Sequence, residues 1–455
     1  MRRTSLLFPA FLLLATAGLG CSVEPAAGPG PDTIAVVTRF EQIAFVGGAF
    51  TERMRFGERT ARSGYTSGPT FFVARYEGAD VRWITPVEGA VRAPDGMAYD
   101  PYDDVVAAVL GSVVLTFDGS DGALLEAEGV SECGIAGFAD VVYSGGRFVG
   151  VCGEGAAFEL VTIDPLRVEN RVATRVYADD ARPVALAADA GGVFVIGELH
   201  GDLVVGTWDG REYGQLRLVS QGDNDDVFLL QVRTPPSAEG ELRDPNDLLY
   251  ARAGRVYGHP DEDDVAVDLE RAHGSIYAVS EYLDAFELDG LPVALGCGHD
   301  PRCDNHLVAR FDDAPERGSF VARWVRAFTP PVAHEMKVVA ISAAADTVGV
   351  TGRFEGTLEV GEETLTSEGG TDVLLALLSA DTGDVEVATS AGGRGDDRGR
   401  DLAIGGPAVG FAVGALREEA VFPKVRYAED GSVVVEQETH VSAGDTDGFV
   451  WTLPL

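Results

Sequence analysis

The sequence predicts an all-β protein, and three observations lead to that fold class. Glycine is frequent, with 57 of 455 residues, which suits a chain with many tight turns. Stretches with helical periodicity are scarce, whereas short runs rich in Val, Phe, Leu and Ala recur throughout. One strand–turn–strand unit is also repeated along the chain, most clearly in residues 337–354 (KVVAISAAADTVGVTGRF).

The repeated unit is a short apolar strand, a brief turn and a second apolar strand ending at a small residue. A third strand follows, as in residues 372–379 (DVLLALLS), and often a fourth, as in residues 385–392 (VEVATSAG). Units of this kind bury their sheet faces against their neighbours, so we expect a β-propeller with about seven blades of three to four antiparallel strands. The seven copies place the small residue at Gly47, Gly111, Gly153, Gly197, Ser280, Gly352 and Gly414.

Other arrangements of the same strands remain open. The strands of a pair of β-sandwiches or of a row of separate β-domains would also alternate between apolar and polar residues. Neither arrangement accounts for one hairpin signature that occurs seven times. The spacing between copies is uneven, shortest from Gly111 to Gly153 and longest from Gly197 to Ser280, which leaves six or eight blades possible. The last copy stops at its third strand, so we expect one blade to have three strands.

The first residues are typical of an export signal. Arg2 and Arg3 precede an apolar stretch that is too short to span a bilayer, so we assign residues 1–20 to a signal peptide. Residues 18–21 (GLGC) resemble the lipobox of bacterial lipoproteins, although that family prefers Leu where Gly18 stands. The resemblance implies lipidation of Cys21 and, with Ser22 following it, an outer-membrane or cell-surface location.

A Pro- and Gly-rich stretch separates this signal from the repeats. We interpret residues 21–32 as a flexible tether and residues 33–455 as the propeller domain. Secretion or a periplasmic location without lipidation is the alternative. The net charge is −38, from 73 acidic and 35 basic residues, and such a surface repels nucleic acid and anionic lipid. We therefore expect no nucleic-acid partner.

Residues 352–383 (GRFEGTLEVGEETLTSEGGTDVLLALLSADTG) resemble the repeat of bacterial surface β-propeller proteins of the SBBP type. In that pattern a strand ends in Gly-x-Phe, a loop ends in Ser-x-Gly-Gly-x-Asp, and an apolar strand follows. The resemblance is good over residues 337–404, fair over 183–235 and 405–455, and poor over 94–182. It implies an exported propeller without known catalysis and says little about a ligand.

Four cysteines remain besides Cys21, an even number that suggests two disulfides in an exported chain. We expect the local pairs Cys133–Cys152 and Cys297–Cys303. Zinc is the alternative for the second pair, because Cys297, His299, Cys303 and His306 are all possible zinc ligands, but they are crowded and the compartment favours oxidation.

Acidic turns recur, and weak calcium binding there is the one cofactor hypothesis that the sequence raises. None has the twelve-residue calcium loop, so we interpret these aspartates as turn residues that accept backbone hydrogen bonds. We expect no other cofactor and no metal site. These turns are residues 222–226, 261–264, 393–397 and 444–448.

The tryptophans point to packing, and we interpret the histidines as surface or turn residues. We expect Trp83, Trp208, Trp324 and Trp451 to pack between blades, with a carbohydrate platform as the alternative. No hydrolase elbow, metalloprotease motif or phosphate loop occurs, and we predict no catalytic residue.

The functional hypothesis is therefore a non-enzymatic binding or scaffolding module at the cell envelope, with a protein or a glycan as partner. Two alternatives stay open: a lyase or hydrolase working from the central channel, and an inert surface-coat protein. His, Asp, Glu or Arg converging in the channel would favour the enzyme, whereas small and apolar residues at its mouth would favour binding. The fold alone cannot decide, because propellers carry many functions.

Overall fold

The computed structural model describes β1 and most of the chain from residue 33 onward. The described residues are 23–26 and 33–454, with gaps at 41, 57, 64–68, 79, 89–91, 190–191, 209–212, 234–249, 295–304, 315–317, 331–334, 345, 406–408, 428–432 and 443–445. Cys21, Cys297 and Cys303, and residues 444–445 of the turn predicted at 444–448, lie outside these residues.

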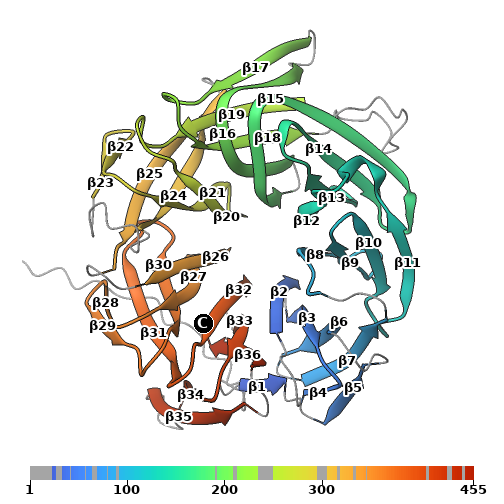
Figure 1. The fold of residues 1–455 in the computed structure, drawn as a ribbon, viewed down its shortest axis with the longest axis vertical. Coiled ribbons are helices and arrows are strands. Elements are labelled where there is room, and N and C mark those ends of the chain that lie inside the picture. Colours follow the sequence, from blue (N-terminus) through green and yellow to red (C-terminus); the bar gives the residue numbers. More distant parts are fainter. Residues whose placement is uncertain are drawn as a thin grey trace, which may run out of the picture.

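Seven antiparallel blades surround a central channel, which confirms the predicted β-propeller (Figure 1). In each blade the first strand lies at the channel and the later strands follow outward. Blades 1 to 3 consist of β2 (Thr33–Phe40), β3 (Ile43–Phe50), β6 (Thr70–Glu77) and β7 (Asp80–Val87); β8 (Gly96–Asp100), β9 (Val105–Leu110), β10 (Val113–Asp118) and β11 (Leu124–Gly129); and β12 (Phe138–Ser144), β13 (Arg147–Cys152), β14 (Gly155–Asp164) and the first part of β15 (Arg167–Asp189).

The strand β15 serves two blades. Its first part is the outer strand of blade 3, pairing with β14, and its last part is the inner strand of blade 4, pairing with β16. Blades 4 to 7 continue with β16 (Gly192–Trp208), β18 (Asp226–Arg233) and β19 (Tyr250–Tyr257); β20 (Val265–Ala272), β21 (Ser275–Tyr282), β24 (Asn305–Ala314) and β25 (Ser319–Phe328); β26 (Met336–Ala344), β27 (Thr347–Phe354), β30 (Asp372–Ser379) and β31 (Val385–Gly393); and β32 (Arg398–Gly405), β33 (Val409–Leu416) and β36 (Asp447–Pro454).

Five blades carry a wedge hairpin between their second and third strands. Neighbouring blades diverge toward the outside of the ring, and apolar hairpin residues fill that space. Leu358 and Val360, for example, pack with Trp324 of blade 5 and Leu374 of blade 6. The wedge hairpins are β4 (Arg53–Phe56) with β5 (Arg59–Arg62), the end of β16 with β17 (Tyr213–Val219), β22 (Phe286–Leu288) with β23 (Leu291–Val293), β28 (Thr357–Val360) with β29 (Glu363–Thr366), and β34 (Glu419–Tyr427) with β35 (Val433–Val441).

The wedge hairpins account for the uneven spacing of the sequence repeats. In blades 2 and 3 the second strand turns directly into the third, without a hairpin, and these blades span the two shortest intervals. The variable interval thus reflects what is inserted within a blade, and the number of blades is seven.

The ring closes through the N-terminal strand. β1 (Val23–Ala26) pairs antiparallel with β36 and completes the four strands of blade 7, so the expectation of a three-stranded blade is corrected. Four residues of the segment expected to be a flexible tether therefore form a strand. The physical reason is that β36 presents an unpaired edge, which any extended segment nearby can satisfy, even one that contains Pro25.

Two of the predicted tryptophans lock neighbouring blades together. The indole Nε1 of Trp83 in blade 1 donates to the Gly119 carbonyl of blade 2 at 2.9 Å, and Trp324 in blade 5 donates in the same way to Ala380 of blade 6. Trp451 is also buried. Packing between blades is therefore the role of these three side chains, as the sequence predicts, and the side chain of Trp208 lies outside the described residues.

A disulfide ties the start of blade 3 to its second strand. Cys133, at the end of the short 3-10 helix η1 (Ser131–Cys133), is bonded to Cys152 at the end of β13. Both sulfurs are buried in the core between blades 2 and 3. Within the described part of the chain, no helix has the length and apolarity needed to cross a membrane.

Candidate binding site in the central channel

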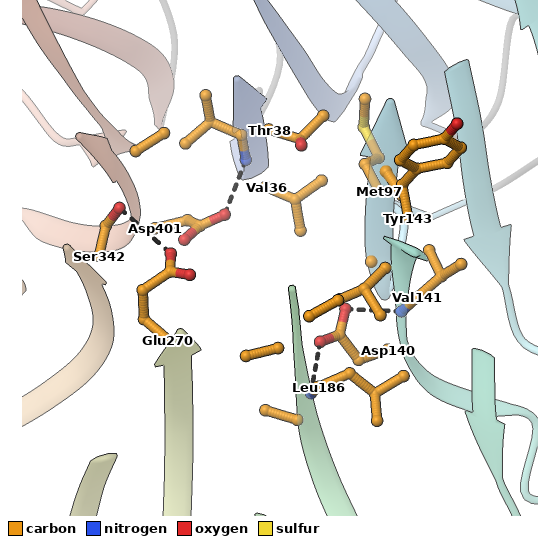
Figure 2. A pocket seen from close by; sticks show the side chains of 18 of the residues that line it. Val36, Thr38, Met97, Asp140, Val141, Tyr143, Leu186, Glu270, Ser342 and Asp401 are labelled. Atoms are coloured by element: carbon orange, nitrogen blue, oxygen red, sulfur yellow. Dashed lines mark hydrogen bonds between the residues drawn. The ribbon is translucent and has the colours of Figure 1, made fainter. Parts of the chain in front are cut away.

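The first strands of all seven blades enclose a cavity of about 1020 Å³ along the axis of the ring (Figures 1 and 2). Small and apolar side chains make up most of its wall. Seven acidic residues of the described chain interrupt this wall: Asp95, Asp103 and Asp189, and the four that we call the channel carboxyls, Asp140, Asp268, Glu270 and Asp401. The apolar lining includes Val36, Ala98, Val142, Ala185, Ala340 and Ala403.

A β-bulge recurs near the start of the inner strand in six blades. It shifts the register between Ile34 and Val36 in β2, and at the equivalent place in β12, β15, β20, β26 and β32. A bulge re-aims the side chain that follows it. That side chain is small or apolar in blades 1, 4 and 6, and it is Asp140, Asp268 or Asp401 in blades 3, 5 and 7.

We call Asp140, Asp268 and Asp401 the interblade carboxylates, because each one bonds two blades together. In Asp140 one carboxylate oxygen accepts from the N–H of Val141 at 2.7 Å and the other from Leu186 of blade 4 at 2.9 Å, as Figure 2 shows. A side chain at Gly96 of blade 2 would approach the same carboxylate to 2.5 Å, so glycine is required there.

The other two interblade carboxylates repeat this geometry. Asp268 accepts from Leu269 at 2.8 Å and from Ile341 of blade 6 at 2.7 Å. Asp401 accepts from Leu402 of its own blade and from Val37 of blade 1, both at 2.7 Å, and so bonds the last blade to the first.

Burial raises the pKa of all three carboxyls. It raises the pKa of Asp140 and of Asp268 to about 7, and it raises that of Asp401 well above its ordinary value. The negative charge of the neighbouring channel carboxyls adds to the shift at Asp140 and Asp401, while the backbone N–H groups act in the opposite direction.

Glu270 is the fourth of the channel carboxyls, and it takes part in a series of hydrogen bonds that links blades 5, 6 and 7. One oxygen accepts from the Arg271 N–H at 2.8 Å, and the other accepts from the Ser342 hydroxyl at 3.5 Å. That hydroxyl in turn accepts from the Ile404 N–H of blade 7 at 2.9 Å. Burial raises the pKa of Glu270 to about 8.

Aromatic side chains gather where the inner strands of blades 1 to 3 end, at one mouth of the channel. Phe40 is 43% exposed and Tyr102 is 87% exposed, whereas Tyr143 is half-buried beside them. We call Phe40, Tyr102 and Tyr143 the aromatic rim. The backbone beneath Tyr102 is fixed, because its N–H donates to the Asp100 carboxylate at 2.9 Å.

The wall of this channel is suited to holding a ligand more than to transforming one. Carboxyls do converge in it, which is what an enzyme would need. However, each of the three interblade carboxylates already uses both oxygens to accept backbone N–H groups. No histidine occurs among the described residues that line the cavity.

In the described residues, aspartates of the acidic turns accept hydrogen bonds from backbone N–H groups. Asp264 accepts from the His259 N–H at 2.6 Å, and Asp397 accepts from Gly393 and Arg417 at 2.9 and 2.7 Å. The turn at 222–226 meets the turn at 261–264, where the Asp225 N–H donates to Asp263 at 3.1 Å. In the described part of the chain, no group of three or more His, Cys, Asp or Glu residues is placed to hold a metal ion.

The four channel carboxyls were not among the functional residues predicted from the sequence, although their positions within buried strands could have indicated them. Each of them adjoins apolar residues of a first strand, as in ADVV at 139–142, VDLE at 267–270 and RDLA at 400–403. A charged residue in a strand expected to be buried on both faces must be paired or hydrogen-bonded. The aromatic rim had no such signal, because its residues lie at strand ends in three different repeats.

Comparisons with known proteins find similarity only among solved structures. No protein-family model matches the chain, and no curated protein matches it in sequence. Among solved structures, the β-propeller domain of Myceliophteria thermophila Cps50 (Swd1) is similar with 9% identity and a TM-score of 0.47, over 86% of this chain and 96% of that one.

Two bacterial structures are similar to the same degree. They are BamB from Moraxella catarrhalis, with 12% identity, a TM-score of 0.41 and coverage of 92% and 95%, and apo AztD from Citrobacter koseri, with 9% identity, a TM-score of 0.43 and coverage of 96% and 98%. These likenesses carry no functional information. The strand topology and the channel define this chain as a seven-bladed β-propeller.

Proposed function

We propose that this chain is an exported, lipid-anchored β-propeller that binds a protein or a glycan of the cell envelope at one mouth of its central channel. Export and the anchor at Cys21 rest on the sequence of residues 1–22. A disulfide suits an oxidising compartment of this kind, and Cys133–Cys152 forms one here.

The aromatic rim carries the binding part of this proposal. Tyr102, which is 87% exposed, and Phe40 both line the cavity of about 1020 Å³, and the ring of Phe40 contacts Tyr99 with centroids 6.2 Å apart. Exposed aromatic rings with polar edges are enriched at protein interfaces, and their faces also stack on ligand rings. Because burial raises the pKa of the channel carboxyls, the protonated groups leave the inner wall with little charge, which favours a neutral group in the part of the ligand that enters.

Affinity capture from solubilised envelope tests the proposal when two variants are compared. We expect the wild type to retain a reproducible partner, and the double variant Phe40→Ala/Tyr102→Ala to lose most of it. Tyr177→Ala is the matched control, because Tyr177 is 62% exposed on β15, away from the channel lining. Equal capture by all three proteins would contradict binding at the rim, and capture of nothing would favour an enzyme or a coat protein.

A further inference from the structure

The wedge hairpin of blade 1 differs from the rest of this acidic molecule. Residues 53–62 (RMRFGERTAR) contain four arginines and one glutamate, in a chain whose net charge is −38. We call Arg53, Arg55 and Arg62 the arginine face. All three side chains are exposed.

The pairing of β4 with β5 puts the arginine face on one side of the hairpin. Arg53 lies directly opposite Arg62, and Arg55 lies opposite Thr60, whereas the alternate pair Met54–Ala61 is buried against the blade. Residues opposite each other in an antiparallel pair point to the same face. The outward face is therefore cationic, and the inward face is apolar.

This arrangement has an electrostatic cost that no contact in the described residues offsets. Like charges directly opposite each other destabilise a strand pair, and Arg53 and Arg62 are such a pair. Some exposed arginines elsewhere do have carboxylate partners: Arg175 contacts Glu159 at 2.7 Å, and Arg323 contacts Asp312 at 2.8 Å. No ion pair of the arginine face occurs within the described part of the chain.

Contacts with blade 1 hold the hairpin in place, so the backbone that carries the arginine face has a defined position. Phe56 packs its ring against Phe72 and Tyr76, with centroids 5.8 and 6.0 Å apart. The fourth arginine, Arg59, donates from Nε to the Val81 carbonyl of β7 at 2.9 Å. Because these contacts already order the hairpin backbone, docking on an anionic surface costs conformational entropy mainly in the arginine side chains.

The arginine face also lies beside the N-terminal strand. β1, β4 and β5 follow one another along the same outer edge of the ring in Figure 1, and β1 contacts β4. β1 begins at Val23, two residues after Cys21. Two residues span about 7 Å when extended, so an acyl anchor on Cys21 would enter the membrane close to this hairpin.

From these observations we propose that the arginine face docks on a lipid surface with anionic headgroups, next to the acyl anchor. The inference rests on the proposed lipidation of Cys21. Guanidinium groups bind phosphate oxygens with paired hydrogen bonds, and stable attachment to membranes commonly combines an acyl chain with a cationic patch. The docked ring stands on its edge, and both mouths of the channel stay accessible, including the aromatic rim.

The acidity of the whole domain does not oppose this docking. At physiological ionic strength, exposed charges farther apart than about 8 Å are largely screened from each other. Carboxylates on the distant blades therefore contribute little at the membrane. Those that do act repel the lipid and turn the rest of the ring away from it, which favours contact through the arginine face.

The test uses the full protein purified from its cells and placed in vesicles, either of phosphatidylcholine alone or mixed with phosphatidylglycerol. An arginine-specific dicarbonyl reagent is applied, and modification of each arginine is read by peptide mass spectrometry. We expect several-fold less modification of Arg53, Arg55 and Arg62 in the anionic vesicles, reversed by high salt, and no change at Arg175 or Arg323. Equal modification in both kinds of vesicle would overturn the docking.

A variant separates docking from a mere difference in reagent access. Arg59 on the same hairpin should also be protected in anionic vesicles, and in Arg53→Gln/Arg55→Gln/Arg62→Gln this protection should be lost. The charge-matched control Arg175→Gln/Arg217→Gln/Arg323→Gln should keep it, and loss in both variants would contradict the proposal. The mass of the N-terminal peptide reports acylation separately: an acylated but unprotected protein refutes docking alone, and an unacylated one refutes the anchor and the docking that rests on it.

Discussion

Aspartate performs the same task at three of the seven junctions between blades. Asp140, Asp268 and Asp401 each accept one N–H from their own strand and one from the next blade. These carboxyls face a channel, where a reader of sequence motifs would look for catalytic acids. Their bonding instead shows how a buried carboxylate can hold two sheets together without a cationic partner.

Replacing one interblade carboxylate by its amide tests this role. In Asp268→Asn only one oxygen remains, so the N–H of either Leu269 or Ile341 loses its acceptor. We expect the free energy of unfolding to fall by about 1–3 kcal/mol, the cost of an unsatisfied buried group. Thermal or urea unfolding measures it, with Asp103→Asn, at an exposed position, as the control. Equal stability of the two variants would contradict the role.

The raised pKa values predict how stability depends on pH. Because the pKa of Asp268 is about 7 in the folded state and lower in the unfolded chain, the folded state holds its proton over the pH range between. The stabilising contribution is therefore full below the unfolded value, about pH 4, and is lost as the pH rises through about 7.

A comparison of wild type with Asp268→Asn isolates this contribution. We expect the stability advantage of the wild type to be larger at pH 5 than at pH 8, measured by unfolding in urea at both pH values. An advantage that grows with pH would show that the carboxyl is ionised at low pH in the folded protein, contrary to the burial described above.

At the scale of elements, the wedge hairpins decide both the size of each blade and how well the ring is packed. Their apolar residues belong to the cores between blades, as Met54, Phe56 and Ala61 do with Phe411 and Val450 of blade 7. Blades 2 and 3 have no such hairpin, and their shared core contains the Cys133–Cys152 disulfide.

Truncating a wedge side chain should cost as much as truncating any core residue. Phe56→Ala removes a fully buried ring and should lower the free energy of unfolding by about 3–5 kcal/mol. Thr60→Ala on the same hairpin is exposed and should change stability little. Thermal unfolding of both variants checks this, and a loss below about 1 kcal/mol for Phe56→Ala would mean that the hairpin is not part of the core.

The sequence predicts the repeated strands well because alternating and continuous apolar runs report burial directly. For that reason it predicts the second strand of each of the seven units, from the one that contains Gly47 to the one that contains Gly414. It could not predict the wedge hairpins, since residues such as Met54 and Leu358 read as ordinary loop residues until a neighbouring blade is present to cover them. The aromatic rim escapes prediction in the same way, because it brings together the ends of strands far apart in the chain.

At the scale of the whole molecule, two contacts close the ring. β1 supplies the outer strand of blade 7, and Asp401 bonds that blade to Val37 of blade 1. Closure removes the exposed sheet face that a row of blades would leave at each end. It also links the N-terminus, and with it the proposed anchor, to the last residues of the chain.

Disrupting β1 should open the ring. Replacing residues 23–26 by Gly-Ser-Gly-Ser leaves the edge of β36 without a stable partner. We expect a lower melting temperature and concentration-dependent association through the exposed edge, read by thermal unfolding and light scattering. The same replacement at residues 27–30 is the control. If the two replacements behave alike, closure by β1 is not what stabilises the ring.

The most direct test of binding at the channel mouth is a footprint of the protein with its captured partner. Hydroxyl-radical labelling, read residue by residue, would compare the free propeller with the complex. The account predicts protection of Phe40, Tyr102 and Tyr143 in the complex, with Tyr177 unchanged. Protection confined to the outer edge of the ring, with the aromatic rim labelled equally in both states, would contradict it.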